Sequence, residues 1–247
     1  MGHLSERQKK KVIESIMSNQ YGYLDTSSVE NLSFAVLPVD DFTGERPLNT
    51  LKVSLQEPYR EGIPNNSGYY LFLDLDANAK YTIVVESDSD QYANYETTID
   101  MATLRQDPTF QKNPVIPVSL LPNTAYPFSP QTTLIRGIVQ TAVASSGANN
   151  TPVAGAEAKI NERNLTYITS EKGDYIFYFK KLRTEDIIEE EVQPGQGKKR
   201  FIKMGTSSLF TLVVNHPDYT EFKQSNNRAE ESKTTVLNVV LIGSPKI

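Results

Sequence analysis

The chain has 247 residues, a formal net charge of −5 at pH 7 and a sequence pI near 5.2. This acidic balance argues against broad binding to nucleic acids or anionic membranes, which need a basic face. The sequence contains no cysteine, which excludes disulfides and thiolate metal sites. It also has no apolar run near the roughly 20 residues that span a bilayer, so we expect neither nucleic acid nor membrane insertion among its interactions.

Residues 1–31 are expected to form a short N-terminal helix or arm. Ser5 can cap a helix, and Gln8 completes a capping box. The apolar residues that follow fall near a helical spacing, at Leu4, Val12, Ile13, Ile16 and Met17. The helix either packs on its own domain or docks on another subunit through Val12, Ile13 and Ile16.

The start of the chain, as given, lacks the apolar core of a signal peptide. We therefore expect cytoplasmic synthesis without a recognisable signal peptide, with incorporation in a particle released from the cell as one destination.

Residues 32–121 indicate a first β-sandwich. Alternating or short apolar runs predict strands at 32–39, 51–55, 69–75, 80–86, 92–99 and 115–121. Aspartate, asparagine and glycine predict turns at 40–45 and 65–68. Pro117 suits only an edge position or the start of a strand, because it cannot donate to a sheet ladder.

Residues 122–133 are expected to form the linker between two domains, and residues 134–247 a second β-sandwich. Prolines at 122, 127 and 130 favour an extended, fairly stiff linker. The second sandwich is predicted to have strands at 134–143, 153–160, 167–170, 174–180, 210–214 and 235–242.

A sequence pattern occurs twice and indicates an internal duplication. A proline precedes an alternating run in each copy, at Pro47 and Pro152, and a turn glycine follows at Gly68 and Gly173. The step from proline to glycine is the same in both copies without a gap. Each glycine follows polar turn residues and is followed by aromatic residues, which predicts a positive φ and then large inward-facing side chains.

The second copy resembles the carboxypeptidase regulatory-like domain, a transthyretin-like β-sandwich. The segments that carry the resemblance are Gly137–Val139, Thr151–Ala156, Thr169–Phe177 and Phe210–Val214 with His216–Tyr219. The first copy departs from this pattern, since Leu32 or a neighbour stands in the place of Gly137 and Thr50 in that of Gly155. The resemblance implies an all-β fold of two tandem transthyretin-like or Ig-like sandwiches, and it implies no activity.

The second copy carries an insertion at residues 182–208 that the first copy lacks. An acidic run and a basic run flank its turn, and they comprise Glu189, Glu190, Glu191, Lys198, Lys199 and Arg200. Opposite charges on either side of a turn predict a projecting hairpin whose arms attract each other across the strands. It is either a solvated hairpin without a partner or a docking element, since long insertions in compact domains are often functional.

The sequence contains no recognisable catalytic or cofactor-binding constellation. It has two histidines, His3 and His216, and neither has a local partner at metal-ligand spacing. There is no G-x-S-x-G motif and no phosphate-binding loop. We therefore expect no enzyme activity, no metal and no cofactor. Two loop functions stay open, which are calcium binding at Asp74, Asp76, Asp88, Ser89 and Asp90, and glycan binding at Tyr21, Tyr23, Tyr59, Tyr92 and Tyr95.

The expected function is that of a non-catalytic structural or adaptor component of a larger protein assembly. Its partners would be other protein subunits in a homo- or hetero-oligomer, and a phage-tail-like or contractile injection particle is one specific setting. The alternative is a cell-surface module for adhesion or glycan binding.

Overall fold

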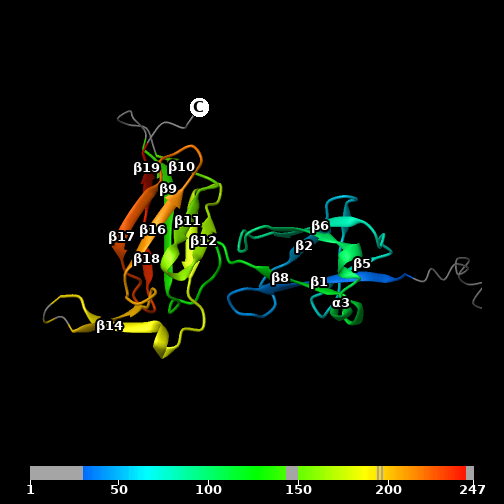
Figure 1. Ribbon diagram of the computed structural model, residues 1–247, viewed down its shortest axis with the longest axis horizontal. Helices are drawn as coiled ribbons and strands as arrows, with labels where there is room; N and C mark the ends of the chain where they lie inside the picture. The colour runs from blue at the N-terminus through cyan, green and yellow to red at the C-terminus, as the bar shows by residue number, and fades with distance from the viewer. Residues whose placement is uncertain (1–29, 143–149, 194, 196, 243–247) are drawn as a thin grey trace, which may run out of the picture.

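The computed structural model describes residues 30–142, 150–193, 195 and 197–242 (Figure 1). The predicted N-terminal helix, with Val12, Ile13 and Ile16, lies outside the described residues. Within the described part, no helix is long and apolar enough to cross a membrane.

The first unit consists of two four-stranded sheets. One has the order β4-β5-β1-β8, formed by Ile63–Pro64, Tyr70–Leu73, Leu32–Asp40 and Val115–Leu120. The other has the order β3-β2-β6-β7, formed by Arg60–Glu61, Leu51–Leu55, Lys80–Ser87 and Tyr95–Asp100. Strand β8 lies at an edge, as Pro117 predicted.

The second unit repeats this arrangement. Its first sheet has β9 (Leu134–Thr141) between β13 (Asp174–Tyr178) and the successive strands β18 (Thr234–Val236) and β19 (Val239–Leu241), with β10 (Thr151–Pro152) also paired to β9. Its second sheet has the order β12-β11-β16-β17, formed by Leu165–Ile168, Glu157–Ile160, Phe210–Asn215 and Phe222–Asn227. A separate hairpin joins β14 (Ile187–Glu191) to β15 (Lys198–Ile202).

The two units share the order and direction of the strands around β1 and β9 and of the four strands in their second sheets. Strand β1 pairs antiparallel with β5 and parallel with β8, and β9 pairs antiparallel with β13 and parallel with β18 and β19. Gly68 and Gly173 both have a positive φ, at 87° and 72°, as predicted. The chain is therefore all-β with tandem β-sandwich domains, and the repeat in the sequence is a repeat in topology.

The apolar alternation predicted from the sequence builds one core in each sandwich. The larger buried side chains of the first core are Phe34, Leu55, Phe72, Ile83, Met101 and Leu120, and those of the second are Ile135, Ile160, Tyr175, Ile202 and Phe210. Burying side chains of this size is worth roughly 1.5–3 kcal/mol each, so the two cores are the main source of stability.

Three local expectations were wrong. The run 153–160 is not one strand, because Gly155 turns the chain at φ 73° between β10 and β11. Two short helices, α2 (Met101–Leu104) and α3 (Pro108–Lys112), were not expected, and aspartate side chains cap both of them. The closing segment 235–242 is split at Leu237, whose carbonyl accepts a hydrogen bond from the Tyr175 hydroxyl at 2.5 Å.

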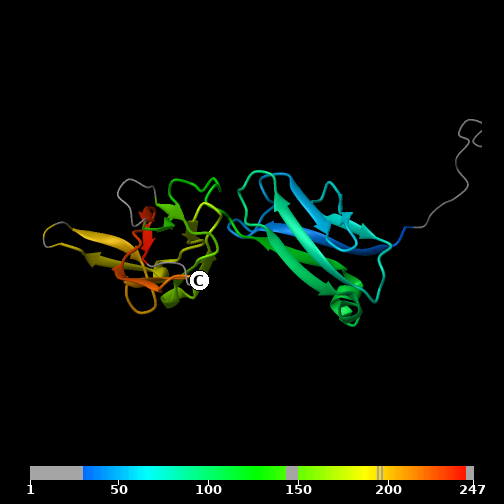
Figure 2. The same cartoon turned by 90° about the horizontal axis from the view of Figure 1, so that it is seen from above.

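The two sandwiches lie side by side, joined by the segment after β8 (Figure 1). The strands of the first run along the long axis of the molecule, and those of the second run across it. Turning the view by 90° shows that the β14–β15 hairpin projects from the second sandwich on the side away from the first (Figure 2). Strand β1 enters the first sandwich at the opposite end of the molecule.

Candidate functional site

The junction between the sandwiches is organised by two consecutive aspartates at the end of β1. Asp40 is fully buried, and its carboxylate accepts four hydrogen bonds. Two come from the backbone N–H groups of Phe42 and Thr43, at 2.8 and 3.1 Å. The other two come from the hydroxyls of Tyr92 and Tyr126, at 2.8 and 2.7 Å. Because Tyr126 belongs to the linker, Asp40 ties the linker to the first sandwich.

Asp41 ties the first sandwich directly to the second. Its carboxylate accepts hydrogen bonds from the Ser119 hydroxyl at 2.9 Å, the Tyr178 hydroxyl at 2.8 Å and the Lys180 ammonium at 2.6 Å. The Lys180 ammonium also donates to the Asp41 backbone carbonyl at 2.7 Å. Burial alone would raise the pKa of Asp41, but the hydrogen bonds from Lys180, Tyr178 and Ser119 outweigh burial and hold this pKa below its ordinary value.

An aromatic cluster surrounds these aspartates and contains residues of both sandwiches and of the linker. The ring centroids of Phe42, Tyr126, Phe128 and Tyr178 lie 4.6 to 6.0 Å apart, mostly in tilted or edge-on pairs. Aromatic pairs in such geometries add about 0.5–1.5 kcal/mol beyond their buried area. The cluster therefore holds the linker between the two domains.

The tyrosine hydroxyls at the junction remain donors at neutral pH. Burial first, and then the hydrogen bond to the Asp40 carboxylate, raise the pKa of Tyr92 to about 12. Burial and the neighbouring carboxylates likewise raise the pKa values of Tyr126 and Tyr178 above the ordinary range. A protonated hydroxyl facing a carboxylate gives a charge-assisted hydrogen bond, which is among the stronger hydrogen bonds in proteins.

The linker is also hydrogen-bonded to the second sandwich. The Thr124 hydroxyl donates to the Asp174 carboxylate at 2.7 Å, and the Tyr167 hydroxyl donates to the Asn123 side-chain oxygen at 2.8 Å. Since these bonds lie along the same short segment as Tyr126, the linker is bonded to both domains rather than free between them.

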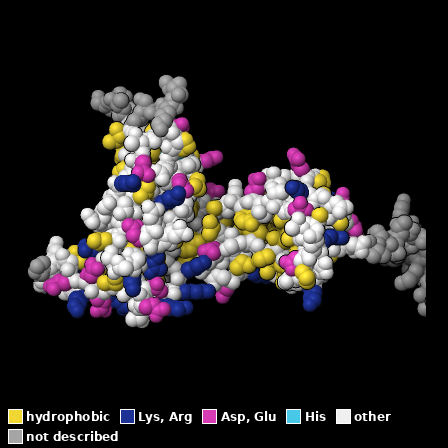
Figure 3. Space-filling view, viewed as in Figure 1, with side chains coloured by type: hydrophobic (Ala, Val, Ile, Leu, Met, Phe, Trp, Pro, Cys, Tyr) yellow, Lys and Arg dark blue, Asp and Glu magenta, His cyan; other side chains and the backbone are white. Residues whose placement is uncertain are grey.

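Two clefts flank Tyr167 at this junction. One has a volume of about 450 Å³ and is lined from both sandwiches, including Asn94, Asn123 and Lys172. The other has a volume of about 280 Å³ and lies between β12 and β13, with Leu121 at its side. Hydrophobic side chains gather on the surface where the two sandwiches meet (Figure 3).

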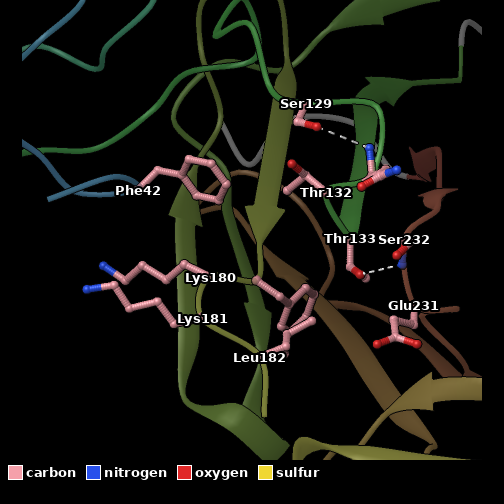
Figure 4. A pocket seen from close by; sticks show the side chains of 11 residues that line it. Phe42, Ser129, Thr132, Thr133, Lys180, Lys181, Leu182, Glu231 and Ser232 are labelled. Carbon is pink, nitrogen blue, oxygen red and sulfur yellow. Dashed lines mark hydrogen bonds between the residues drawn. The ribbon is translucent and has the colours of Figure 1, made fainter. Parts of the chain in front are cut away.

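A further pocket of about 320 Å³ lies beside the junction and is lined by hydroxyl and lysine side chains (Figure 4). The Thr133 hydroxyl accepts a hydrogen bond from the Ser232 backbone N–H at 2.7 Å. Lys180 and Lys181 extend away from these hydroxyls (Figure 4), and Lys180 pairs with Asp41. The polar groups of this pocket therefore serve local structure and do not converge on one point.

The hairpin forms in the register that places the two charged runs opposite each other. Glu189 faces Arg200, Glu190 faces Lys199 and Glu191 faces Lys198. The predicted attraction across the strands was wrong, however, because among the described residues no ion pair joins these facing side chains.

The charges of the hairpin pair with neighbouring loop residues instead. Arg200 lies 2.9 Å from Glu231, Lys199 lies 3.9 Å from Glu230, and Arg228 lies 3.3 Å from Glu190. Glu190 also accepts a hydrogen bond from the buried Ser208 hydroxyl at 2.8 Å. Of the six predicted residues, three are thus used to hold the hairpin on its own domain.

The other three charged residues of the hairpin remain exposed. Glu191 accepts a hydrogen bond from the Gly195 backbone N–H in the turn at 2.7 Å. Glu189 and Lys198 have no hydrogen-bond or ion-pair partner within the described ranges. These side chains, together with the exposed Val192, form the part of the hairpin that is open to a partner.

The other predicted site residues are scattered. Tyr92 is buried at the junction, so its interpretation as an exposed sugar-binding ring was wrong, whereas Tyr59 is 58% exposed. Tyr21 and Tyr23 lie outside the described residues. His216 accepts a hydrogen bond from the Asp218 backbone N–H at 3.2 Å.

The predicted acidic loop residues do not form a cluster. Within the described ranges, no three acidic or histidine side chains lie close enough to hold a metal ion, and this includes Asp74, Asp76, Asp88 and Asp90. Ser89 binds side chains of its own surface, since its hydroxyl accepts from the Asn49 amide at 2.6 Å.

Sequence reasoning did not find the residues of the junction. The signal that was available is the pair Asp40-Asp41 directly after an apolar strand, together with Tyr126 and Phe128 in a proline-rich linker. Two aspartates in a turn are ordinary, and nothing in the sequence distinguishes a buried carboxylate from an exposed one.

Comparisons with known proteins found no matching family model and no matching curated protein. Three solved structures represent the structural matches. They are the TIE protein of Bacillus anthracis, the shaft pilin SpaA of Lactobacillus rhamnosus GG, and a carbohydrate-binding module of family CBM26 from Eubacterium rectale in complex with maltoheptaose.

The sequence identity to these structures is 10%, 10% and 11%, and the TM-scores are 0.25, 0.25 and 0.21. The matches cover 87%, 89% and 86% of this chain. They cover 34%, 100% and 95% of the solved chains, so this chain spans about a third of the TIE protein chain.

Proposed function

We propose that this chain is a non-catalytic structural or adaptor module that holds two binding ends in a fixed geometry within a larger protein assembly. The observation that carries the proposal is the bonding of Asp41 to Tyr178 and Lys180, which joins the two sandwiches without passing through the linker. A flexible tether would need none of these contacts, since linker composition alone sets reach and stiffness.

The two binding ends lie on opposite sides of the junction. The described chain starts at the far end of the first sandwich, where residues 1–29 attach (Figure 1). The hairpin projects from the far side of the second sandwich (Figure 2). Its exposed Glu189, Glu191 and Lys198 favour other protein subunits as partners, because mixed charges on a projecting hairpin suit a polar interface rim.

A distance measurement tests the proposal. The sequence has no cysteine, so Lys80→Cys and Lys223→Cys carry spin labels at two unique exposed positions, one in each sandwich. Pulsed dipolar spectroscopy should give one narrow distance distribution, and Asp41→Ala should broaden it. Thr98→Ala, in β7 of the first sandwich, is the control, because its hydroxyl bonds Thr82 of the neighbouring strand, and it should leave the distribution narrow. A broad distribution in the unaltered chain would refute the proposal.

The second candidate function is adhesion at a cell surface, including glycan binding. The larger junction cleft favours it, because amide and charged groups at Asn94, Asn123 and Lys172 lie beside the ring of Tyr167 and the exposed Ile168. Sugars need polar groups of this kind next to a flat apolar surface. No feature of the described residues favours a phage-tail-like or contractile injection particle, so we prefer the cell-surface setting to that one.

The carboxypeptidase regulatory-like assignment of the second sandwich also stays a proposal. It is supported by the turn at Gly173, by Tyr175 and Phe177 in the core, and by the same topology in both units.

Nuclear magnetic resonance titration with maltoheptaose and other neutral oligosaccharides tests the glycan candidate. Saturable shifts at Asn94, Ile168 and Lys172, reduced by Asn94→Ala, would support it. No shift at these residues at millimolar sugar would exclude glycan binding in this cleft. That result would not affect the proposal that the chain holds two binding ends in a fixed geometry.

A further inference from the structure

Strand β14 of the projecting hairpin has an open edge. The sheet of the hairpin consists of β14 and β15, and within the described ranges no strand lies on the other side of β14. The outer side of β15 is covered, because the Ile202 N–H donates to the Ala229 carbonyl and the Glu231 N–H to the Arg200 carbonyl, both at 2.9 Å. An unpaired strand edge is a template for pairing with another chain.

The hydrogen bonds of β15 determine which backbone groups of β14 point outward. Since Arg200 and Ile202 bond to the loop, the residues between and beside them bond to β14. The Lys203 N–H, which donates to the Asp186 carbonyl at 2.7 Å, agrees with this alternation. The even-numbered residues of β14 therefore bond to β15. The odd-numbered residues direct their N–H and C=O groups to the open side, and they are Ile187, Glu189 and Glu191.

These outward groups are accessible. Glu189 and Glu191 are exposed, and Ile187 is half-buried. The Ile187 N–H donates to the Thr184 carbonyl, but the Ile187 carbonyl and the N–H and C=O groups of both glutamates bond to no described residue. The hairpin projects away from the first sandwich (Figure 2), so that domain leaves the edge uncovered.

The side chains along this edge are acidic on one face. Because side chains alternate along a strand, Glu189 and Glu191 lie on the same face as Ile187. Glu189 has no ion-pair partner among the described residues, and Glu191 accepts a hydrogen bond from the Gly195 N–H. In an added strand, the residues directly opposite would lie on this same face. Two basic side chains separated by one residue would therefore meet the two glutamates.

The charges disfavour a second copy of this chain as the added strand. Two copies of β14 that pair antiparallel about Glu189 would place this glutamate opposite its own equivalent. Like charges directly opposite each other destabilise a strand pair, and charged edges keep identical copies from pairing. A basic segment would instead bring opposite charges together.

We propose that β14 is the docking edge for an extended basic segment of a partner protein, which adds to the hairpin as a third strand. The segment runs antiparallel to β14. It carries lysine or arginine opposite Glu191 and Glu189, and then an aliphatic residue opposite Ile187, which packs against the second core. The segment is thus the partner at the hairpin end, so its docking rests on the proposed function. The net charge of −5 also favours a basic partner.

A peptide added to the full chain tests this pairing. The probe is blocked at both ends and has the order lysine, threonine, lysine, threonine, valine. At saturation it should slow amide hydrogen exchange at Glu189 and Glu191 at least about tenfold, because their N–H groups become bonded. The amides of Ile188 and Glu190, which already bond to β15, should change far less. No added protection at Glu189 and Glu191 at millimolar peptide would overturn the proposal.

Two methylated peptides separate strand addition from charge attraction alone. N-methylation of both lysines removes the donors that face β14, so binding should weaken at least about tenfold. N-methylation of both threonines is the matched control, because the threonine N–H groups would point to solvent, and it should change binding much less. Equal losses with the two peptides would contradict the added strand.

Charge reversal on the protein tests the chemistry of the partner. Glu189→Lys should weaken binding of the unmodified peptide at least about tenfold, since it places like charges opposite each other. Glu221→Lys is the matched control, because it changes the net charge equally at an exposed position. Glu221 lies just before β17, whereas the loop that pairs with the hairpin follows that strand. Equal weakening by both variants would contradict docking at β14.

Sedimentation velocity without peptide tests a second copy as the occupant. Self-association of the unaltered protein that protects the Glu189 amide would contradict a basic partner. The spin-label distance between positions 80 and 223 tests the proposed function separately, because peptide binding at β14 does not involve the junction. A narrow distance distribution without peptide binding refutes the docking edge alone, whereas a broad distribution refutes the fixed geometry.

Discussion

Replacing the buried carboxylate of Asp40 should destabilise the first sandwich strongly. Asp40→Asn keeps one oxygen as the acceptor for the backbone N–H groups of Phe42 and Thr43. The other oxygen, which accepts from the hydroxyls of Tyr92 and Tyr126, is replaced by an uncharged amide NH₂ group. Hydrogen bonds to charged groups contribute about 1.5–3 kcal/mol each, so losing two costs roughly 3–6 kcal/mol. Because the new amide can donate to a tyrosine oxygen, we expect about 3 kcal/mol.

Two further variants set the scale of this effect. Asp40→Ala also leaves the two backbone N–H groups without an acceptor, and each buried unsatisfied group costs about 1–3 kcal/mol, so its loss of stability should be larger still. Tyr126→Phe removes a single hydroxyl and should cost about 1–2 kcal/mol. Tyr59→Phe is the matched control on the exposed surface and should be nearly neutral.

Urea unfolding measures these differences in the free energy of unfolding. It is followed by circular dichroism and by the one-dimensional proton NMR signals of each domain. Since Asp40 and Tyr126 share one bond, their double variant should cost less than the sum of the two single variants. If Asp40→Asn unfolds within about 0.5 kcal/mol of the unaltered protein, as an ordinary surface substitution would, the assignment of Asp40 as the buried acceptor of the junction is wrong.

The remaining predictions concern the junction at low pH, one glycine and the hairpin. The pKa of Asp41 is lower in the folded protein than its ordinary value of 3.8, so the stabilisation from its carboxylate is present above pH 3.8 and is lost as the pH falls through the folded pKa. The spin-label distance distribution between positions 80 and 223 should therefore broaden in acid. Asp41→Asn should give a broad distribution already at neutral pH. Gly137→Ala should prevent native closure of the second sandwich in thermal unfolding, since its Cβ would lie 1.9 Å from the Leu237 carbonyl oxygen; a native-like melting temperature would contradict this. Arg200→Ala should cost less than about 1 kcal/mol in urea unfolding, because its pair with Glu231 is exposed, and a loss above 2 kcal/mol would show a larger role.

Much of the fold could be predicted from the sequence because its signals are local. The alternation of apolar and polar residues predicted the bounds of β2 and β6 nearly to the residue. The equal spacing from Pro47 to Gly68 and from Pro152 to Gly173 predicted that both units turn at the same place. The helices α2 and α3 were missed because they are only 4 and 5 residues long and show no helical periodicity.

The candidate site was harder to predict because it depends on contacts between distant segments. Asp41 meets Tyr178 and Lys180 across more than a hundred residues, and no local pattern reports such a pairing. The hairpin illustrates the same limit, since its register follows from the charge runs, but the pairing of Arg200 with Glu231 depends on a loop that only the folded sandwich brings near.

The central claim is that the two sandwiches are held as one body at the Asp40–Asp41 junction, and residual dipolar couplings of the backbone amides test it most directly. If the claim holds, one alignment tensor fits the amides of β2 and β6 together with those of β11 and β16. Separate tensors of different magnitude for the two sandwiches would contradict it.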